Sequence, residues 1–132
     1  MTLDQKDRKQ LIQYRIMQAL ETVETVDFLI ENSKLNTAVN RIYYGIFYSL
    51  LALGLKYGFE SSKHLQLIGW FNKEFIRSGK IDVKYGRIVR EAYDIRRTGD
   101  YDAYIEFEQA EVEKYFQDMK DFTFFIKNFI QN

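Results

Sequence analysis

The stretch of sequence most suited to chemistry spans residues 90–107 and reads REAYDIRRTGDYDAYIEF. Two adjacent arginines, Arg96 and Arg97, are followed there by aspartates and tyrosines. Because a guanidinium group stays charged and binds phosphate through a fork of donors, the pair could contact a phosphate. The arginines could equally pair with Asp100 or Asp102 across a turn, and such exposed ion pairs stabilise a fold by under about 1 kcal/mol. A phosphate site and a structural corner are both consistent with this stretch.

Two side chains outside this stretch could join such a site. Arg41 lies in a strongly apolar segment, where a guanidinium needs a partner to offset its burial. If folding brings that segment to the arginine pair, Arg41, Arg96 and Arg97 would together bind the phosphate of a nucleotide. His64 is the single histidine of the chain, and near a helix start it could cap the helix, pack, or serve as a proton acceptor.

Composition limits the remaining possibilities. The chain has no cysteine and one histidine, so we expect neither a metal site nor a cofactor bound through thiolates. Its 19 basic and 19 acidic residues balance, so the protein has no net positive charge that would attract it to nucleic acid or anionic membranes. The most apolar run, residues 42–55, is too short for a bilayer span and is not N-terminal. We therefore expect a cytoplasmic protein without membrane contact.

The elements that carry these side chains are predicted to be helices. Apolar residues recur every three or four positions, and no alternating strand pattern competes. Gly58, Gly79 and Gly99 each follow a basic turn and predict left-handed helix ends, while Asp82 predicts a helix start. Without proline or a linker-like stretch, the chain is expected to form one helical domain over residues 1–132. The predicted helices cover residues 6–31, 36–57, 62–78, 82–98 and 107–130.

The second predicted helix, residues 36–57, is apolar on nearly every side and should be the most buried element. Small residues along one edge would let another helix approach closely, and that helix could belong to the same chain or to a second copy. This stripe and the many aromatic residues lead us to expect a homodimer. The stripe consists of Ala38, Gly45, Ser49 and Ala52.

Three stretches, AVNRIYYGIFYSLLALGLKYG, SSKHLQLIGWFNKEFIRSGKID and IRRTGDYD, together resemble the HEPN domain family, in particular its small stand-alone bacterial and archaeal branch. The resemblance covers roughly residues 10 to 130. It implies an all-α fold, an antiparallel four-helix up-and-down bundle with an additional short helix, often present as a homodimer. It also implies a nucleotidyltransferase partner and, in many members, metal-independent ribonuclease activity as a toxin. The residues that carry it are Arg41 with Tyr43 and Tyr44, Lys63 with His64, and Arg96 with Gly99, Asp100 and Tyr101.

The family's ribonuclease motif is an arginine, four to six residues, a histidine and, two positions later, a tyrosine. Here Arg97 and Tyr104 fit, but Asp102 stands where the histidine is expected. An aspartate, with an ordinary pKa of about 3.9, is a poor proton acceptor and donor at neutral pH beside two arginines. The resemblance therefore implies a member that binds RNA, a nucleotide or its partner without the usual cleavage.

Two other functions stay open at this stage. One is an active ribonuclease toxin, in which Arg97 and Asp102, or His64 as a relocated base, would be the catalytic residues. The other is a purely structural helical dimer. If a nucleotidyltransferase partner exists, the resemblance implies AMP modification of Tyr104, with Tyr101 as the second choice.

Overall fold

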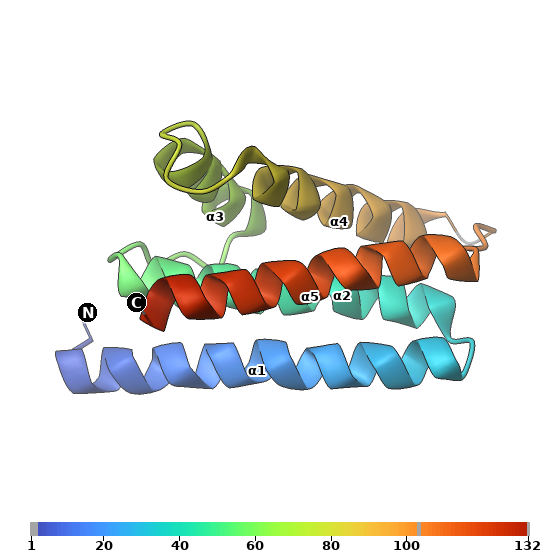
Figure 1. Cartoon of the computed structure of the whole chain (residues 1–132), viewed down its shortest axis with the longest axis horizontal. Helices are drawn as coiled ribbons and strands as arrows, with labels where there is room; N and C mark the ends of the chain where they lie inside the picture. The colour runs from blue at the N-terminus through green and yellow to red at the C-terminus, as the bar shows by residue number, and fades with distance from the viewer. Residues whose placement is uncertain (1–2, 103, 132) are drawn as a thin grey trace.

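The computed structural model describes residues 3–102 and 104–131, which form helices and no strand. The elements are α1 (Gln5–Glu31), α2 (Leu35–Lys56), α3 (His64–Phe71), the π-helix η1 (Asn72–Ile76), α4 (Val83–Tyr101) and α5 (Gln109–Gln131). Four long helices, α1, α2, α4 and α5, run alternately up and down (Figure 1). A short helical segment, α3 with η1, connects α2 to α4. This arrangement confirms the predicted all-α antiparallel bundle.

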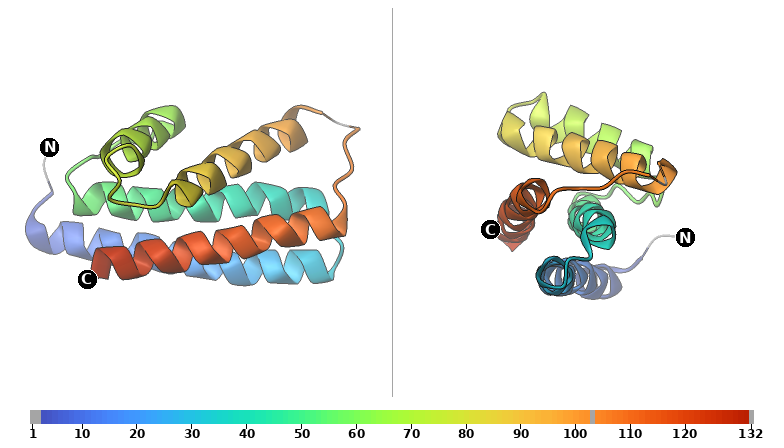
Figure 2. Two further views of the ribbon diagram at one scale, coloured as in Figure 1. Left: turned by 45° about the horizontal axis from the view of Figure 1, so that its top comes forward. Right: turned by 90° about the vertical axis from the view of Figure 1, so that its right-hand side faces the viewer.

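Helix α2 is the centre of the bundle, with α1, α4 and α5 packed around it (Figure 2). Its side chains Ile42, Ile46, Leu50 and Leu53 are at most 1% exposed, as predicted from its apolar pattern. Burying large aliphatic side chains on several faces of one helix is the main stabilising contribution in such a small core, at about 1.5–3 kcal/mol each.

The small-residue stripe on α2 is covered inside the same chain. A Cβ built on Gly45 would overlap the terminal methyl of Met119 in α5 and lie 3.3 Å from Cγ2 of Thr22 in α1. The side chains of Met119 and Thr22 thus fill the space beside Gly45 from two neighbouring helices. The stripe therefore gives no support to a homodimer, and the dimer stays a prediction on other grounds.

Two of the three predicted glycine ends are confirmed, and one is wrong. Gly58 and Gly79 have φ of 82° and 80°, the left-handed conformation that glycine adopts without strain. Gly99, in contrast, lies inside α4, which continues to Tyr101. A Cβ at Gly99 would lie 3.1 Å from Cε2 of Phe107, so this glycine makes room for the chain that follows the helix.

The other boundaries agree with small shifts. Asp82 caps α4 by accepting a hydrogen bond from the amide of Lys84 at 2.8 Å. The predicted helix over residues 62–78 is a short α-helix that continues as a π-helical turn, a rare conformation that sequence periodicity does not reveal. Among the described helices, none combines the length and the apolarity needed to cross a membrane.

Candidate functional site

Side chains of α2, α3 and α4 meet on one side of the bundle in what we term the aromatic–arginine cluster. The rings of Tyr43 and Tyr44 lie 5.4 Å apart, edge to face, and the ring of Tyr93 lies 5.7 Å from that of Tyr43. Such edge-to-face contacts stabilise aromatic pairs beyond simple burial. The cluster consists of Tyr43, Tyr44, His64, Tyr93 and Arg96.

His64 is fixed in the cluster by Tyr43. The Tyr43 hydroxyl lies 2.6 Å from Nδ1 of His64, and the ring of His64 stacks on Phe47 with centroids 4.0 Å apart. Burial raises the pKa of Tyr43 far above its usual value, so the hydroxyl keeps its proton. No other described residue is within hydrogen-bonding distance of this fully buried hydroxyl, so the hydroxyl donates to Nδ1.

This hydrogen bond sets the tautomer of His64. Burial and, secondly, the nearby charge of Arg96 lower the pKa of His64, which is therefore neutral at pH 7. With Nδ1 accepting from Tyr43, the single ring proton sits on Nε2. Nε2 is then a hydrogen-bond donor, and the nitrogen that could take up a proton is already occupied. This argues against His64 as a relocated catalytic base.

Arg96 points inward and holds the cluster together. Its Nη2 donates to the Tyr44 hydroxyl at 3.1 Å, and its guanidinium carbon lies 5.2 and 5.3 Å from the ring centres of Tyr43 and Tyr44. Its Nε lies 2.8 Å from a carboxylate oxygen of Asp100, without the alignment of a hydrogen bond, and the side chain is 22% exposed. The structural pairing predicted for this corner therefore exists between Arg96 and Asp100.

Arg97 and Arg41 flank the cluster and remain available to a ligand. Arg97 is exposed, with its guanidinium carbon 5.7 Å from the ring centre of Tyr93. Arg41 lies over Tyr44 at 4.7 Å and donates to the amide oxygen of Asn40 at 3.0 and 3.1 Å. Within the described part of the chain, neither arginine has a carboxylate within 4 Å. Folding thus brings Arg41, Arg96 and Arg97 around one aromatic cluster.

The motif positions after Arg97 form an exposed corner. Asp102 ends α4, and its Oδ1 accepts a hydrogen bond from the amide of Tyr104 at 3.0 Å. Its carboxylate therefore fixes a turn. Tyr101 and Tyr104 are 84% and 94% exposed, and Ala103 between them lies outside the described residues.

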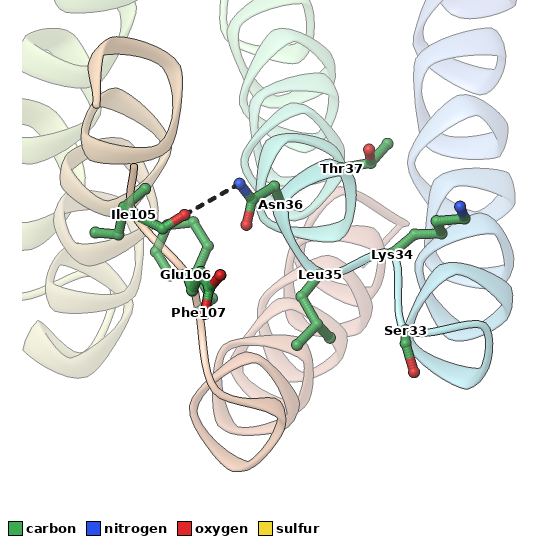
Figure 3. Close-up of a pocket in the computed structure, with 8 residues that line it drawn as sticks. All are labelled: Ser33, Lys34, Leu35, Asn36, Thr37, Ile105, Glu106 and Phe107. Atoms are coloured by element: carbon green, nitrogen blue, oxygen red, sulfur yellow. Dashed lines mark hydrogen bonds between the residues drawn. The ribbon is translucent and has the colours of Figure 1, made fainter. Parts of the chain in front are cut away.

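The chain beyond this corner is tied to the start of α2. The Nδ2 of Asn36 donates to the carbonyl of Ile105 at 3.4 Å across a shallow pocket between the α1–α2 turn and residues 105–107 (Figure 3). Its charged side chains are Lys34 and Glu106, and none of the described residues that line it is a histidine. The hydrogen bond from Asn36 therefore ties the chain after the corner to the start of α2. Across residues 3–102 and 104–131, no three histidine, aspartate or glutamate side chains converge as a metal site requires.

Comparison with known proteins decides the family. The family model described as HEPN domain matches residues 12–129. The chain belongs to the HEPN domain family. It is 33% identical over 126 residues to a Thermotoga maritima protein named "UPF0332 protein", covering 96% of each chain. The resemblance inferred from the sequence is thus confirmed.

Two proteins of Methanocaldococcus jannaschii are also similar, and each is named "Putative toxin". One is 36% identical over 105 residues, which cover 80% of this HEPN chain and 71% of the relative. The other is 38% identical over 96 residues, which cover 73% and 72%. These names link relatives of this HEPN protein to toxins.

Proposed function

We propose that this HEPN protein binds single-stranded RNA across the aromatic–arginine cluster and does not cleave it. The observation that carries the proposal is the placement of Arg41 against the half-buried ring of Tyr44 and of Arg97 against that of Tyr93, with no carboxylate of the described residues paired to either arginine. Single-stranded nucleic acids are bound in this manner, with phosphates on basic side chains and bases stacked on aromatic faces. Arg96 would act indirectly, by fixing the ring of Tyr44.

The absence of cleavage follows from the proton chemistry. Metal-independent cleavage of RNA requires a base for the 2′-hydroxyl proton and an acid for the leaving oxygen. Asp102 is engaged with the amide of Tyr104, and Nδ1 of neutral His64 accepts a hydrogen bond from the Tyr43 hydroxyl, which keeps its proton. Neither group is suited to both tasks at neutral pH. The RNA would therefore be held intact.

Fluorescence anisotropy with a labelled single-stranded RNA tests the proposal. Each of Arg41→Gln and Arg97→Gln should weaken binding and lower the slope of log K against log salt by about 0.7, the loss of one phosphate contact. Lys9→Gln, an exposed change on α1, is the matched control and should leave both quantities unchanged. Unchanged affinity in the Arg41→Gln, Arg97→Gln double variant would contradict the proposal.

A second candidate function is a ribonuclease toxin, supported by the names of the two archaeal relatives. In that case, Arg97 would stabilise the charge on phosphorus, and Asp102 or His64 would have to transfer the protons. Cleavage of the labelled RNA by purified wild-type protein in the presence of a chelator would favour this candidate.

We also propose two protein partners, a nucleotidyltransferase and a second copy of this chain. A cognate nucleotidyltransferase would find Tyr104 and Tyr101 accessible, since both hydroxyls are on strongly exposed rings. A homodimer is supported by the tyrosine and arginine content of the cluster surface, because both residue types are enriched in interfaces. The cytoplasm, which supplies RNA and ATP, is the compartment in which this function would operate.

A further inference from the structure

A groove runs between the α3–η1 segment and α4, next to the aromatic–arginine cluster. It encloses about 570 Å³, within the range of ligand-binding clefts. Its walls are mainly aliphatic, and arginines stand at its edge. The residues that matter here are Leu65, Ile68, Ile76, Val83, Arg77 and Arg90, which together we term the α3–α4 groove.

The groove exposes aliphatic surface that the bundle does not use. Leu65 and Val83 are 65% and 73% exposed although both belong to helices that pack on the core. Ile68 and Ile76 continue the aliphatic surface below them, toward the core. A contiguous apolar surface of this kind, rimmed by polar residues, is typical of an interaction site.

The edge of the groove is positively charged. Arg77 and Arg90 are exposed, and neither has a carboxylate within 4 Å in the described residues. Arg87, also at the groove, is neutralised by Glu91 at 3.0 Å and Asp118 at 3.9 Å. Two uncompensated charges therefore face any occupant, which favours an acidic one.

The wall of the groove has an unusual backbone. Asn72 and Ile76 belong to the π-helix η1, a rare conformation found frequently at functional sites. Opposite η1, a Cβ at Gly86 would lie 3.2 Å from Cγ1 of Ile76, so the glycine lets the two walls approach. The shape of the groove thus depends on two local features that a helical bundle does not need.

We propose that the α3–α4 groove binds an acidic amphipathic helix of a partner protein. Helices bind in apolar grooves through side chains at i, i+3, i+4 and i+7, and the aliphatic walls suit leucine or isoleucine at those positions. Glutamates beside them would meet Arg77 and Arg90. RNA is the less suitable occupant, because Tyr93 is the sole aromatic ring among the described lining residues and bases stack on rings.

A second copy of this HEPN protein is also less suitable. One exposed face that combines acidic and apolar residues lies on α1, where Glu21, Glu24 and Phe28 are exposed. Figure 1 shows α1 on the side of the bundle away from α3 and α4. Docking of α1 into the groove of another copy would be head to tail and would leave free faces at both ends, giving open chains in place of a closed dimer.

The test uses a labelled peptide of about 18 residues, long enough for a stable bound helix, with leucines at i, i+3, i+4 and i+7 and glutamates between them. Fluorescence anisotropy should show saturable binding that weakens with salt, and a peptide with lysines in place of glutamates should not bind. Leu65→Asp and Arg90→Glu should each weaken binding at least about tenfold. Both side chains are exposed, so neither variant should unfold the protein.

Lys9→Glu changes the charge by the same amount as Arg90→Glu. Lys9 is an exposed residue of α1, the helix that Figure 1 shows away from α3 and α4, so this variant should leave peptide binding unchanged. The proposal is overturned if the peptide does not bind at about 1 mM, or if all three variants bind it equally. It is also overturned if Leu65→Asp turns a dimer into a monomer in light scattering, since a second copy then occupies the groove.

Loss of RNA binding in Arg90→Glu with peptide binding intact would assign the groove to RNA. No RNA is present in the peptide assay, so its failure is separate from failure of the RNA proposal.

Discussion

The adjacent arginines provide a sharp prediction, because Arg96 points into the bundle and Arg97 points to solvent. Arg96→Met should lower the free energy of unfolding by about 2 kcal/mol. The contributions are a hydrogen bond to Tyr44 of about 1 kcal/mol, a cation–π interaction with two rings of about 0.5–1 kcal/mol, and a part-exposed ion pair with Asp100 of under about 1 kcal/mol. Arg97→Met, which removes one contact with a ring at 5.7 Å, should change stability by less than about 0.5 kcal/mol.

Urea unfolding followed by circular dichroism measures both values. A double-mutant cycle of Arg96→Met and Tyr44→Phe should give a coupling of about 1 kcal/mol, because the two side chains share one hydrogen bond. Equal destabilisation by Arg96→Met and Arg97→Met, or a coupling near zero, would refute the division between an inward and an outward arginine.

Three further predictions concern pH, packing and modification. The pKa of His64 is lowered in the folded state, so the unfolded state binds a proton at a higher pH than the folded state does. The free energy of unfolding should therefore decrease as pH drops below about 6.5. In urea titrations, His64→Gln should make this decrease smaller. Gly69→Ala, where a Cβ meets nothing within 4 Å, should stabilise the protein by about 0.5–1 kcal/mol, whereas Gly99→Ala, which crowds Phe107, should give no such gain in melting experiments. With a cognate nucleotidyltransferase and ATP, mass spectrometry should find an AMP adduct that disappears in Tyr104→Phe; an adduct confined to other tyrosines would contradict this.

Much of the fold could be predicted because its signals are local. The period of apolar residues located the first and the last long helix, and the all-round apolar pattern of residues 36–57 identified the central one. The start of α4 was located by its capping residue, Asp82. Gly58 and Gly79 predicted helix ends correctly because the positive φ of such an end depends only on the residue type and the local turn. The prediction for Gly99 was wrong because glycine also permits close packing. Gly99 packs against Phe107, and this contact depends on the path of the chain after α4, which the helix pattern does not give.

The site was predictable in its residues but not in their roles. The sequence singled out Arg41, Arg96 and Arg97, yet which arginine faces inward depends on how α4 is rotated against α2. Tyr93 was missed as a member of the cluster, although its position three residues before Arg96 on a helix was a usable signal. The tautomer of His64 depends on a hydrogen bond to Tyr43, which the sequence does not contain.

In the function proposed for this HEPN protein, Arg97 binds phosphate, as the arginine of the family's motif would, and no side chain transfers the protons. The most direct test incubates end-labelled single-stranded RNA with wild-type protein and with Asp102→His, in the presence of a chelator, and resolves the products on a gel. We expect intact RNA with the wild type, cleavage with Asp102→His, and loss of that cleavage when Arg97→Gln is added. Robust cleavage by the wild type that disappears with His64→Ala would contradict it, because the catalytic base would then lie in the aromatic–arginine cluster.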